Sequence, residues 1–371
     1  MATKLFSPIS LRLLDLTNRI VVAPMCQYSA VDGTMTDWHL MHLGQFAVSG
    51  AGLVFVEATG VEAAGRITHG CTGLYSDENE VAMARVIKFF REYGSARIGI
   101  QIGHAGRKAS VDLPWRGGAS LKPANGAWQT AAPSAVAFDP SWHVPEAMTE
   151  ETLGRVRDGF IQATRRAARL GFDAIEVHSA HGYLLHTFLS PLSNRRNDKY
   201  GGSLENRMRY PLEVFDAVRA EWPEDKPMGV RFSASDWVEG GWDIEGSVAY
   251  SQALKERGCD FVDVSSGGLS PDQKIDLGPG YQAHFAAEIR RETGLPVMAV
   301  GMITDPVQAE TILKTGQADM VSLARGMLFD PRWPWHAAVA LGDQAAFPAQ
   351  YMRAHGSLRG APVPADPPWT V

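Results

Sequence analysis

Short apolar runs alternate with stretches of helical spacing along most of the chain. Eight runs are apolar at nearly every position, which is typical of parallel strands buried on both faces. They lie at residues 19–24, 53–58, 97–102, 174–177, 228–233, 261–265, 296–300 and 319–324. We expect each run to be one strand of a single parallel sheet.

Amphipathic stretches that predict helices separate these runs. They lie at residues 37–49, 77–93, 149–170, 204–222, 245–257, 283–293, 306–315 and 331–341. The third is clearly delimited, because Thr149 precedes two acidic residues and Gly171 follows Leu170. Eight strands alternating with eight helices predict an α/β fold, the (β/α)8 TIM barrel. A doubly wound sheet is the alternative, but no G-x-G-x-x-G follows the first strand.

Two segments interrupt the alternation. Residues 103–148 are rich in Gly, Pro, Trp and Ala and are too long for an ordinary connection, so we expect an insertion over the barrel mouth. Residues 347–371 are rich in proline and predict an extended C-terminal tail. We therefore expect one barrel domain, residues 1–346, followed by this tail.

Composition and charge exclude several classes of protein. The 371 residues are 45% hydrophobic and 20% charged, which is typical of a globular protein. A net charge of −6 without a basic cluster argues against nucleic acid as a partner. The polar N-terminus broken by Pro8 and the lack of a run of about 18 apolar residues favour a cytoplasmic protein that does not span a membrane. Cys26, Cys71 and Cys259 have no metal-site spacing, so we expect neither a metal nor a disulfide framework.

The most informative residues follow the fourth predicted strand. His178, His181 and Tyr183 come directly after it, and in a TIM barrel the active site lies at this end of the strands. Two imidazoles can donate hydrogen bonds to one polarised oxygen, and a phenol can supply a proton. The alternative is a pair of loop histidines beside a half-buried tyrosine without a catalytic role.

Other strand ends predict a bound heterocycle with a phosphate. Gln101 offers a donor and an acceptor that match an imide edge, and Arg231 would meet an anion or an electron-rich ring. Gly301 and Arg325 follow the last two strands, where TIM barrels commonly bind phosphate. Reduced FMN has a phosphate, an imide edge and a place for negative charge.

Several motifs together resemble the old yellow enzyme family of FMN-dependent ene reductases, and within it the bacterial branch typified by YqjM and xenobiotic reductase A. The resemblance covers nearly the whole chain. It rests on Asn18–Ile20 with Ala23–Tyr28, Gly50–Leu53 with Glu57–Ala58, Gln101–Lys108, Glu176–Leu184, Asn197–Arg207, and Ala324–Met327 with Asp330–Pro331.

This resemblance implies a set of flavin-binding residues. One group would line the isoalloxazine ring, and Cys26 within it would lie near the C4 carbonyl and tune the flavin potential. A second group would hold the phosphate. The first comprises Pro24, Met25, Cys26, Ala58, Gln101, His178 and Arg231; the second comprises Gly301 and Arg325 with the neighbouring Val300 and Ala324.

The resemblance also implies the reaction. NADPH or NADH would supply a hydride, which passes through flavin N5 to the activated C=C bond of an α,β-unsaturated carbonyl or related compound. His178 and His181 would hold the substrate oxygen, Tyr183 would donate the proton, and Tyr28 would help to close the pocket. The segment that ends at Arg353 resembles one that reaches into a neighbouring subunit's active site, which implies a homodimer or a larger assembly.

Other TIM-barrel enzymes remain as alternatives to this prediction. The main one is a flavin-free isomerase or aldolase that acts on a phosphorylated small molecule. A Schiff-base aldolase requires a lysine at a strand end, and none of the eight predicted strands ends on one. Dienoyl-CoA reductases resemble this family but add an iron–sulfur domain, for which three scattered cysteines give no support.

Overall fold

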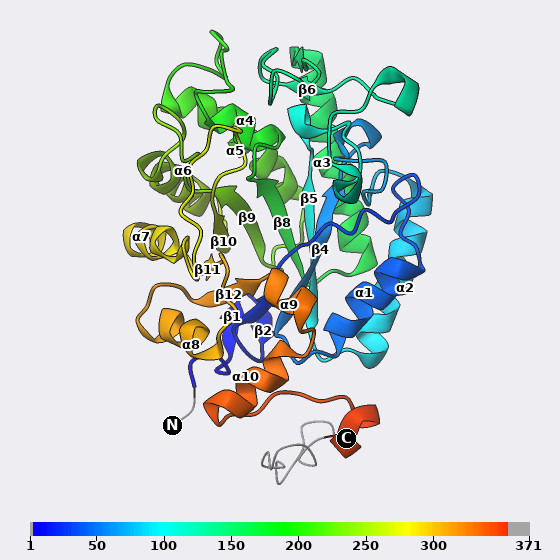
Figure 1. The fold of residues 1–371 in the computed structure, drawn as a ribbon, viewed down its shortest axis with the longest axis vertical. Coiled ribbons are helices and arrows are strands. Elements are labelled where there is room, and N and C mark those ends of the chain that lie inside the picture. The colour runs from blue at the N-terminus through cyan, green and yellow to red at the C-terminus, as the bar shows by residue number, and fades with distance from the viewer. Residues whose placement is uncertain (1–2, 355–371) are drawn as a thin grey trace.

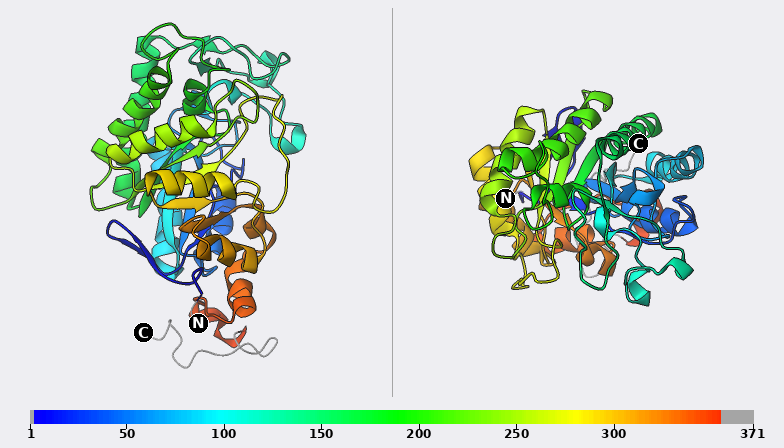
Figure 2. Two further views of the ribbon diagram at one scale, coloured as in Figure 1. Left: turned by 90° about the vertical axis from the view of Figure 1, so that its left-hand side faces the viewer. Right: turned by 90° about the horizontal axis from the view of Figure 1, so that it is seen from above.

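The protein forms a closed barrel of eight parallel strands surrounded by helices (Figures 1 and 2). The structure is a computed structural model and describes residues 3–354. In order around the barrel, neighbouring strands pair in the sequence β10-β11-β12-β3-β4-β5-β8-β9. Their bounds are β3 Ile20–Val22, β4 Leu53–Gly60, β5 Arg97–Gly103, β8 Ala174–Ser179, β9 Met228–Ser233, β10 Phe261–Ser265, β11 Val297–Ala299 and β12 Met320–Leu323. The predicted (β/α)8 barrel is confirmed.

The eight predicted helices are also present, with ends that differ by a few residues. Thr149 caps the third of them by accepting the amide of Thr152, and Gly171 ends it in the left-handed region at φ 82°. The sequence did not predict two short helices, α4 Leu184–Leu189 and α9 Arg325–Phe329. The main helices are α1 Asp37–Ala47, α2 Asp77–Tyr93, α3 Glu150–Leu170, α5 Leu204–Glu221, α6 Ile244–Glu256, α7 Ala283–Thr293, α8 Pro306–Lys314 and α10 Trp333–Leu341.

A hairpin that the sequence did not predict closes the N-terminal end of the barrel. It pairs β1 (Ile9–Leu11) with β2 (Leu14–Leu16) in antiparallel register. Its leucines pack against side chains at or near the starts of the barrel strands and form an apolar floor. The floor comprises Leu11, Leu14, Leu16, Val21, Leu53, Phe55, Ala174, Phe261, Met298 and Met320.

The insertion between β5 and α3 lies over the opposite end (Figure 1). It contains three 3₁₀ turns, η2 Gly106–Lys108, η3 Pro114–Arg116 and η4 Pro123–Asn125, and the short strands β6 Ala131–Ala132 and β7 Glu146–Ala147. Trp115 packs edge-on against Tyr28 at 6.1 Å between ring centroids, and Arg107 donates to the carbonyl of Leu269 at 2.7 Å. The insertion therefore contacts loops that follow strands on both sides of the mouth.

The described part of the C-terminal tail differs from the prediction. Residues Ala349–Ala354 form 3₁₀ turns, η5, where extended chain was expected. The ring of Tyr351 lies 4.6 Å from the Arg332 guanidinium and 6.1 Å from Trp335 of α10, and these contacts favour a compact turn. Residues 355–371 of the predicted tail lie outside the described residues. Within residues 3–354, no helix has the length and apolar character needed to cross a bilayer.

Candidate active site

Alternate residues of β8 point into the barrel and lead from its floor to its mouth. Ala174 belongs to the floor, Glu176 lies in the barrel interior, and His178 reaches the mouth, because side chains two apart share a face of a strand. The same alternation places Gln101 on β5 opposite Glu176 and Arg231 on β9 opposite His178. The sheet therefore brings Gln101 and Arg231, which are more than a hundred residues apart in sequence, into the same barrel interior.

The three residues that led the sequence analysis converge at this mouth. The ring centroids of His178 and His181 are 5.3 Å apart, and Tyr183 lies 5.0 Å from His178 and 6.5 Å from His181. Nδ1 of His178 accepts the amide of Ala180 at 3.1 Å, so the neutral ring carries its proton on Nε2. On His181, Nε2 contacts the hydroxyl of Ser265 at 2.8 Å, which leaves Nδ1 for a ligand.

The loop that carries His181 is held in an unusual conformation. His181 itself has φ 58°, in the left-handed region that non-glycine residues rarely adopt. A Cβ on the following Gly182 would lie 2.3 Å from the carbonyl oxygen of Gly268, so only glycine permits the two loops to approach. Nζ of Lys108 donates to the carbonyls of His181 and Gly268 at 3.0 and 2.9 Å and joins the loops.

Burial fixes the protonation of these groups. It lowers the pKa of His178 and His181 well below the ordinary value, with a further contribution from Arg231, so both rings are neutral donors at neutral pH. Burial also raises the pKa of Tyr183 well above its ordinary value, and the phenol keeps its proton. The arrangement offers hydrogen-bond donors and a protonated hydroxyl without an adjacent imidazolium.

A second wall of the site comes from the chain after β3. Cys26 and Tyr28 are half-buried, as are Pro24 and Met25. Burial, followed by the charge of Glu57, raises the pKa of Cys26 well above its ordinary value, so it is a thiol. The register of β4 against β5 shifts between Val56 and Thr59. Ala58 lies at this irregularity and is the half-buried residue of an otherwise buried strand.

A cavity of about 310 Å³ opens between Arg231 and the turns that follow β11 and β12. At Gly301, φ is 123°, and a Cβ there would lie 2.9 Å from Nε2 of Gln282, so this turn is strained for any residue other than glycine. The lining includes four predicted cofactor residues, Val300, Gly301, Ala324 and Arg325, together with Ser265, Tyr281, Gln282 and Ser322.

These residues fit FMN. Nε of Arg231 is buried and has no hydrogen-bond partner among residues 3–354, which is costly for a cation unless a ligand supplies one. Gln101, 2% exposed, uses its Nε2 to donate to Glu176 at 2.7 Å. Its carbonyl and second N–H remain for an imide edge. Arg231, one of the predicted ring-binding residues, thus lines the same cavity as the predicted phosphate-binding residues.

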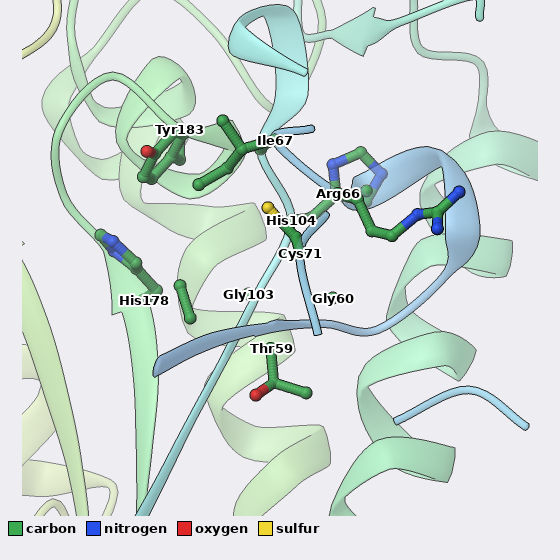
Figure 3. A pocket seen from close by; sticks show the side chains of 12 residues that line it. Thr59, Gly60, Arg66, Ile67, Cys71, Gly103, His104, His178 and Tyr183 are labelled. Carbon is green, nitrogen blue, oxygen red and sulfur yellow. The ribbon is translucent and has the colours of Figure 1, made fainter. Parts of the chain in front are cut away.

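A smaller cavity, also lined by His178 and Tyr183, includes several residues that the sequence did not predict as part of the site. Figure 3 shows Ile67 beside Tyr183, with Arg66 and His104 farther across the cavity and Cys71 between. Nε2 of His104 lies 3.0 Å from Glu62, which also pairs with Arg155. His104 lies within the Gln101–Lys108 motif, whereas no motif separated Glu62, Arg66 and Ile67 from ordinary loop residues.

The structure does not bring Arg353 to the site of its own chain. Arg353 belongs to η5, which lies at the opposite end of the molecule from α4 and the site (Figures 1 and 2). All the other predicted site residues lie in the C-terminal halves of the barrel strands, in the loops that follow them or, for Arg325, at the start of α9.

Comparison with known proteins identifies the family. Residues 4–344 match the NADH:flavin oxidoreductase / NADH oxidase family. The NADPH dehydrogenases of Geobacillus thermodenitrificans and Bacillus subtilis are 46% and 43% identical, each over 355 residues that cover 95% of this chain and 99% of the relative. Morphinone reductase in complex with tetrahydroNAD superposes with a TM-score of 0.75 at 27% identity, covering 92% of each chain. This protein therefore belongs to the NADH:flavin oxidoreductase / NADH oxidase family, and it is an NAD(P)H-dependent FMN ene reductase of the old yellow enzyme type.

Proposed function

We propose that the enzyme reduces the activated C=C bond of α,β-unsaturated carbonyl compounds through His178, His181 and Tyr183. The observation that carries this proposal is the convergence of two neutral imidazoles and one protonated phenol at the barrel mouth. An electrophilic alkene needs donors for its oxygen and a proton for its α-carbon, and these three groups supply both.

We assign the FMN-binding site to residues on two sides of the barrel mouth. Gln101 and Arg231 would hold the pyrimidine edge, with Ala58 and Pro24–Cys26 beside the ring. Gly301 and Arg325, with Val300 and Ala324, would hold the phosphate at the far end of the cavity. When bound there, FMN supplies the hydride that the protein itself cannot carry, and NADPH or NADH replenishes it.

The chain's own groups then have separate tasks. Nε2–H of His178 and Nδ1–H of His181 donate to the substrate oxygen and stabilise the negative charge that develops on it. Tyr183 holds its proton on the hydroxyl until the α-carbon accepts it. Tyr28, whose ring packs against Trp115 at 6.1 Å, would help to close the pocket and limit access of water.

Assembly is part of the same proposal. A homodimer would place Arg353 of one subunit at the partner's mouth, and exposed apolar side chains on α9, α10 and η5 support an interface. Phe329 of α9 is 94% exposed, and Leu328, Val339, Tyr351 and Met352 are also exposed. In a confirmed dimer, Arg353→Ala should raise KM for the substrate, whereas Arg291→Ala, a change at an exposed arginine of α7, should not. An unchanged KM in Arg353→Ala would contradict this part.

We also propose that the barrel is the single domain of residues 1–346 and that the protein is cytoplasmic. The three cysteines are free thiols, which suits a reducing compartment. Fractionation of cells that express the tagged full chain tests the location.

The proposed reaction is tested by anaerobic half-reactions. NADPH should bleach the flavin of the purified enzyme, and a simple enone such as cyclohexenone should restore its colour and yield the saturated ketone. A flavin that NADPH bleaches but no enone, enal or maleimide reoxidises would overturn the proposed substrate class.

A further inference from the structure

Five polar side chains fill the barrel between its apolar floor and the active site. This buried polar cluster comprises Gln101, Glu176, Arg231, Asp263 and Ser322, which are between 0% and 7% exposed. Oε1 of Glu176 accepts from Gln101 at 2.7 Å, Arg231 lies 3.6 Å from Asp263, and Ser322 donates to Asp263 at 3.3 Å. The proposed function uses Gln101 and Arg231 and leaves the two carboxyl groups without a role.

The charges of the cluster do not balance when every group is ionised. Two carboxylates would then face one guanidinium, and the excess negative charge would lie in the barrel interior. Oε2 of Glu176 and Oδ1 of Asp263 have no hydrogen-bond partner within residues 3–354. An unpaired buried carboxylate is strongly disfavoured, so one proton on the cluster removes the excess.

The groups that act on Glu176 are few. Arg231 on β9 and Asp263 on β10 are the charged ones, and Gln101 on β5 is a neutral donor. Burial, followed by the charge of Asp263, raises the pKa of Glu176 to about 8, and burial also raises the pKa of Asp263. Glu176 therefore keeps its proton at neutral pH, and the charge of Asp263 links the titration of Glu176 to that of its neighbour.

We propose that Glu176 and Asp263 share one proton, and that Glu176 is thereby a positioning residue that sets how strongly the charge of Arg231 acts on the bound flavin. This proposal rests on the proposed function, which seats the flavin on Gln101 and Arg231. With the proton in place, the cluster is neutral, and Nε of Arg231 remains available to the cofactor. When Glu176 releases its proton to water, a second carboxylate competes for Arg231, and negative charge gathers beneath the flavin. That charge opposes the negative charge that the flavin carries when it is reduced.

Glu176 also orients Gln101. Because Nε2 of Gln101 donates to Glu176, the amide is held with its carbonyl and second N–H directed elsewhere. A glutamine at position 176 can accept the same hydrogen bond through its carbonyl but cannot ionise. Glu176→Gln therefore removes the titration of Glu176 but keeps the hydrogen bond that orients Gln101.

The test is the midpoint potential of the bound FMN in the holoenzyme, measured by spectroelectrochemical titration from about pH 6 to about pH 10. The curves of wild type and Glu176→Gln should run parallel at low pH. Above the pKa of about 8 the wild-type potential should fall more steeply. Ser322→Ala removes a hydrogen bond to the same Asp263 without adding or removing a charge, and its potential curve should keep the wild-type shape.

A second control excludes Lys108, whose pKa burial lowers to about 8 as well. Lys108→Met should keep the steeper fall if Glu176 is its source. Parallel curves for wild type and Glu176→Gln at every pH, or loss of the fall in Lys108→Met, would overturn the proposal.

An infrared measurement tests the shared proton without the flavin potential. Wild type at neutral pH should show the C=O stretch of a buried protonated carboxyl group, and Glu176→Gln should lack it. Absence of this band in wild type would also overturn the proposal. A protein that shows the band but never binds FMN would instead contradict the proposed cofactor seat, so the two failures are distinguishable.

If Glu176→Gln does not fold, Asp263→Asn takes its place. The remaining carboxylate would then pair with Arg231 and stay ionised, so both the fall and the band should be lost.

Discussion

Replacing Tyr183 by phenylalanine removes the proposed proton donor and little else. The ring lies edge-on to His178 at 5.0 Å, and Nζ of Lys108 lies 5.5 Å from its centre. Both contacts involve the ring, so the fold should be retained. A positioned general acid contributes about 10²- to 10⁴-fold to the rate, which corresponds to roughly 3–5 kcal/mol of barrier. Only the half-reaction that protonates the α-carbon should lose this contribution.

Stopped-flow absorbance of the flavin separates the two half-reactions. In Tyr183→Phe, reduction by NADPH should stay within about twofold of wild type, because no proton from Tyr183 is involved. Reoxidation by cyclohexenone should slow by about 10²- to 10⁴-fold. Equal slowing of both half-reactions would indicate a distorted site, and unchanged reoxidation would show that another group supplies the proton. Either result would refute the assignment of Tyr183.

Three further predictions follow from the surrounding contacts. Ser265→Ala removes the 2.8 Å contact to Nε2 of His181. A lost hydrogen bond of about 0.5–1.5 kcal/mol should weaken phenol binding roughly two- to twelvefold. An unchanged Kd for phenol would show that Ser265 does not orient the His181 ring. Asp236→Asn breaks a fully buried pair with His186 at 2.9 Å, so unfolding in urea at pH 7 should show a loss of about 3–5 kcal/mol. Burial alone would raise the pKa of Asp236, but His186 holds it below its ordinary value. The stabilisation by this pair is therefore present above the unfolded pKa of about 3.9 and is lost as pH falls through the folded pKa. If Asp236→Asn lost as much free energy of unfolding near pH 3 as at pH 7, the pairing would be contradicted. Burial lowers the pKa of Lys108 to about 8, so between about pH 8 and the unfolded pKa of about 10.4 the unfolded chain binds more protons than the folded protein. The stability of wild type relative to Lys108→Met should therefore rise with pH over that range. A fall would show that the lysine is charged in the folded state.

The barrel could be predicted from the sequence because its strands are apolar on both faces. Several of these strands are followed by residues whose side chains can bind a ligand or transfer a proton. The run that precedes His178 predicted a buried strand, and the TIM-barrel rule then placed His178, His181 and Tyr183 at the mouth. The shape of the barrel also brought Gln101 and Arg231 to the same end. These predictions needed only periodicity and the direction of the strands.

Other features depend on contacts that no local pattern reveals. The hairpin β1–β2 has strands of three residues, too short for a period to be visible. Lys108 comes from the insertion and meets the carbonyl of His181 across 73 residues of sequence. Glu176 stands within an apolar run, and its inward direction becomes clear only when the barrel closes. Pro348 and its proline-rich surroundings suggested extended chain, whereas the packing of Tyr351 on α10 favours turns.

The most direct test of the account is the visible spectrum of the purified enzyme as a simple phenol is added. We expect a yellow protein that gains a long-wavelength charge-transfer band as His178 and His181 hold the phenolate against the flavin. His178→Ala and His181→Ala should each lose a hydrogen bond to a charged oxygen, about 1.5–3 kcal/mol, and bind phenol roughly 10- to 150-fold more weakly. A yellow protein without the band, or with unchanged affinity in both variants, would contradict the assignment of the histidine pair.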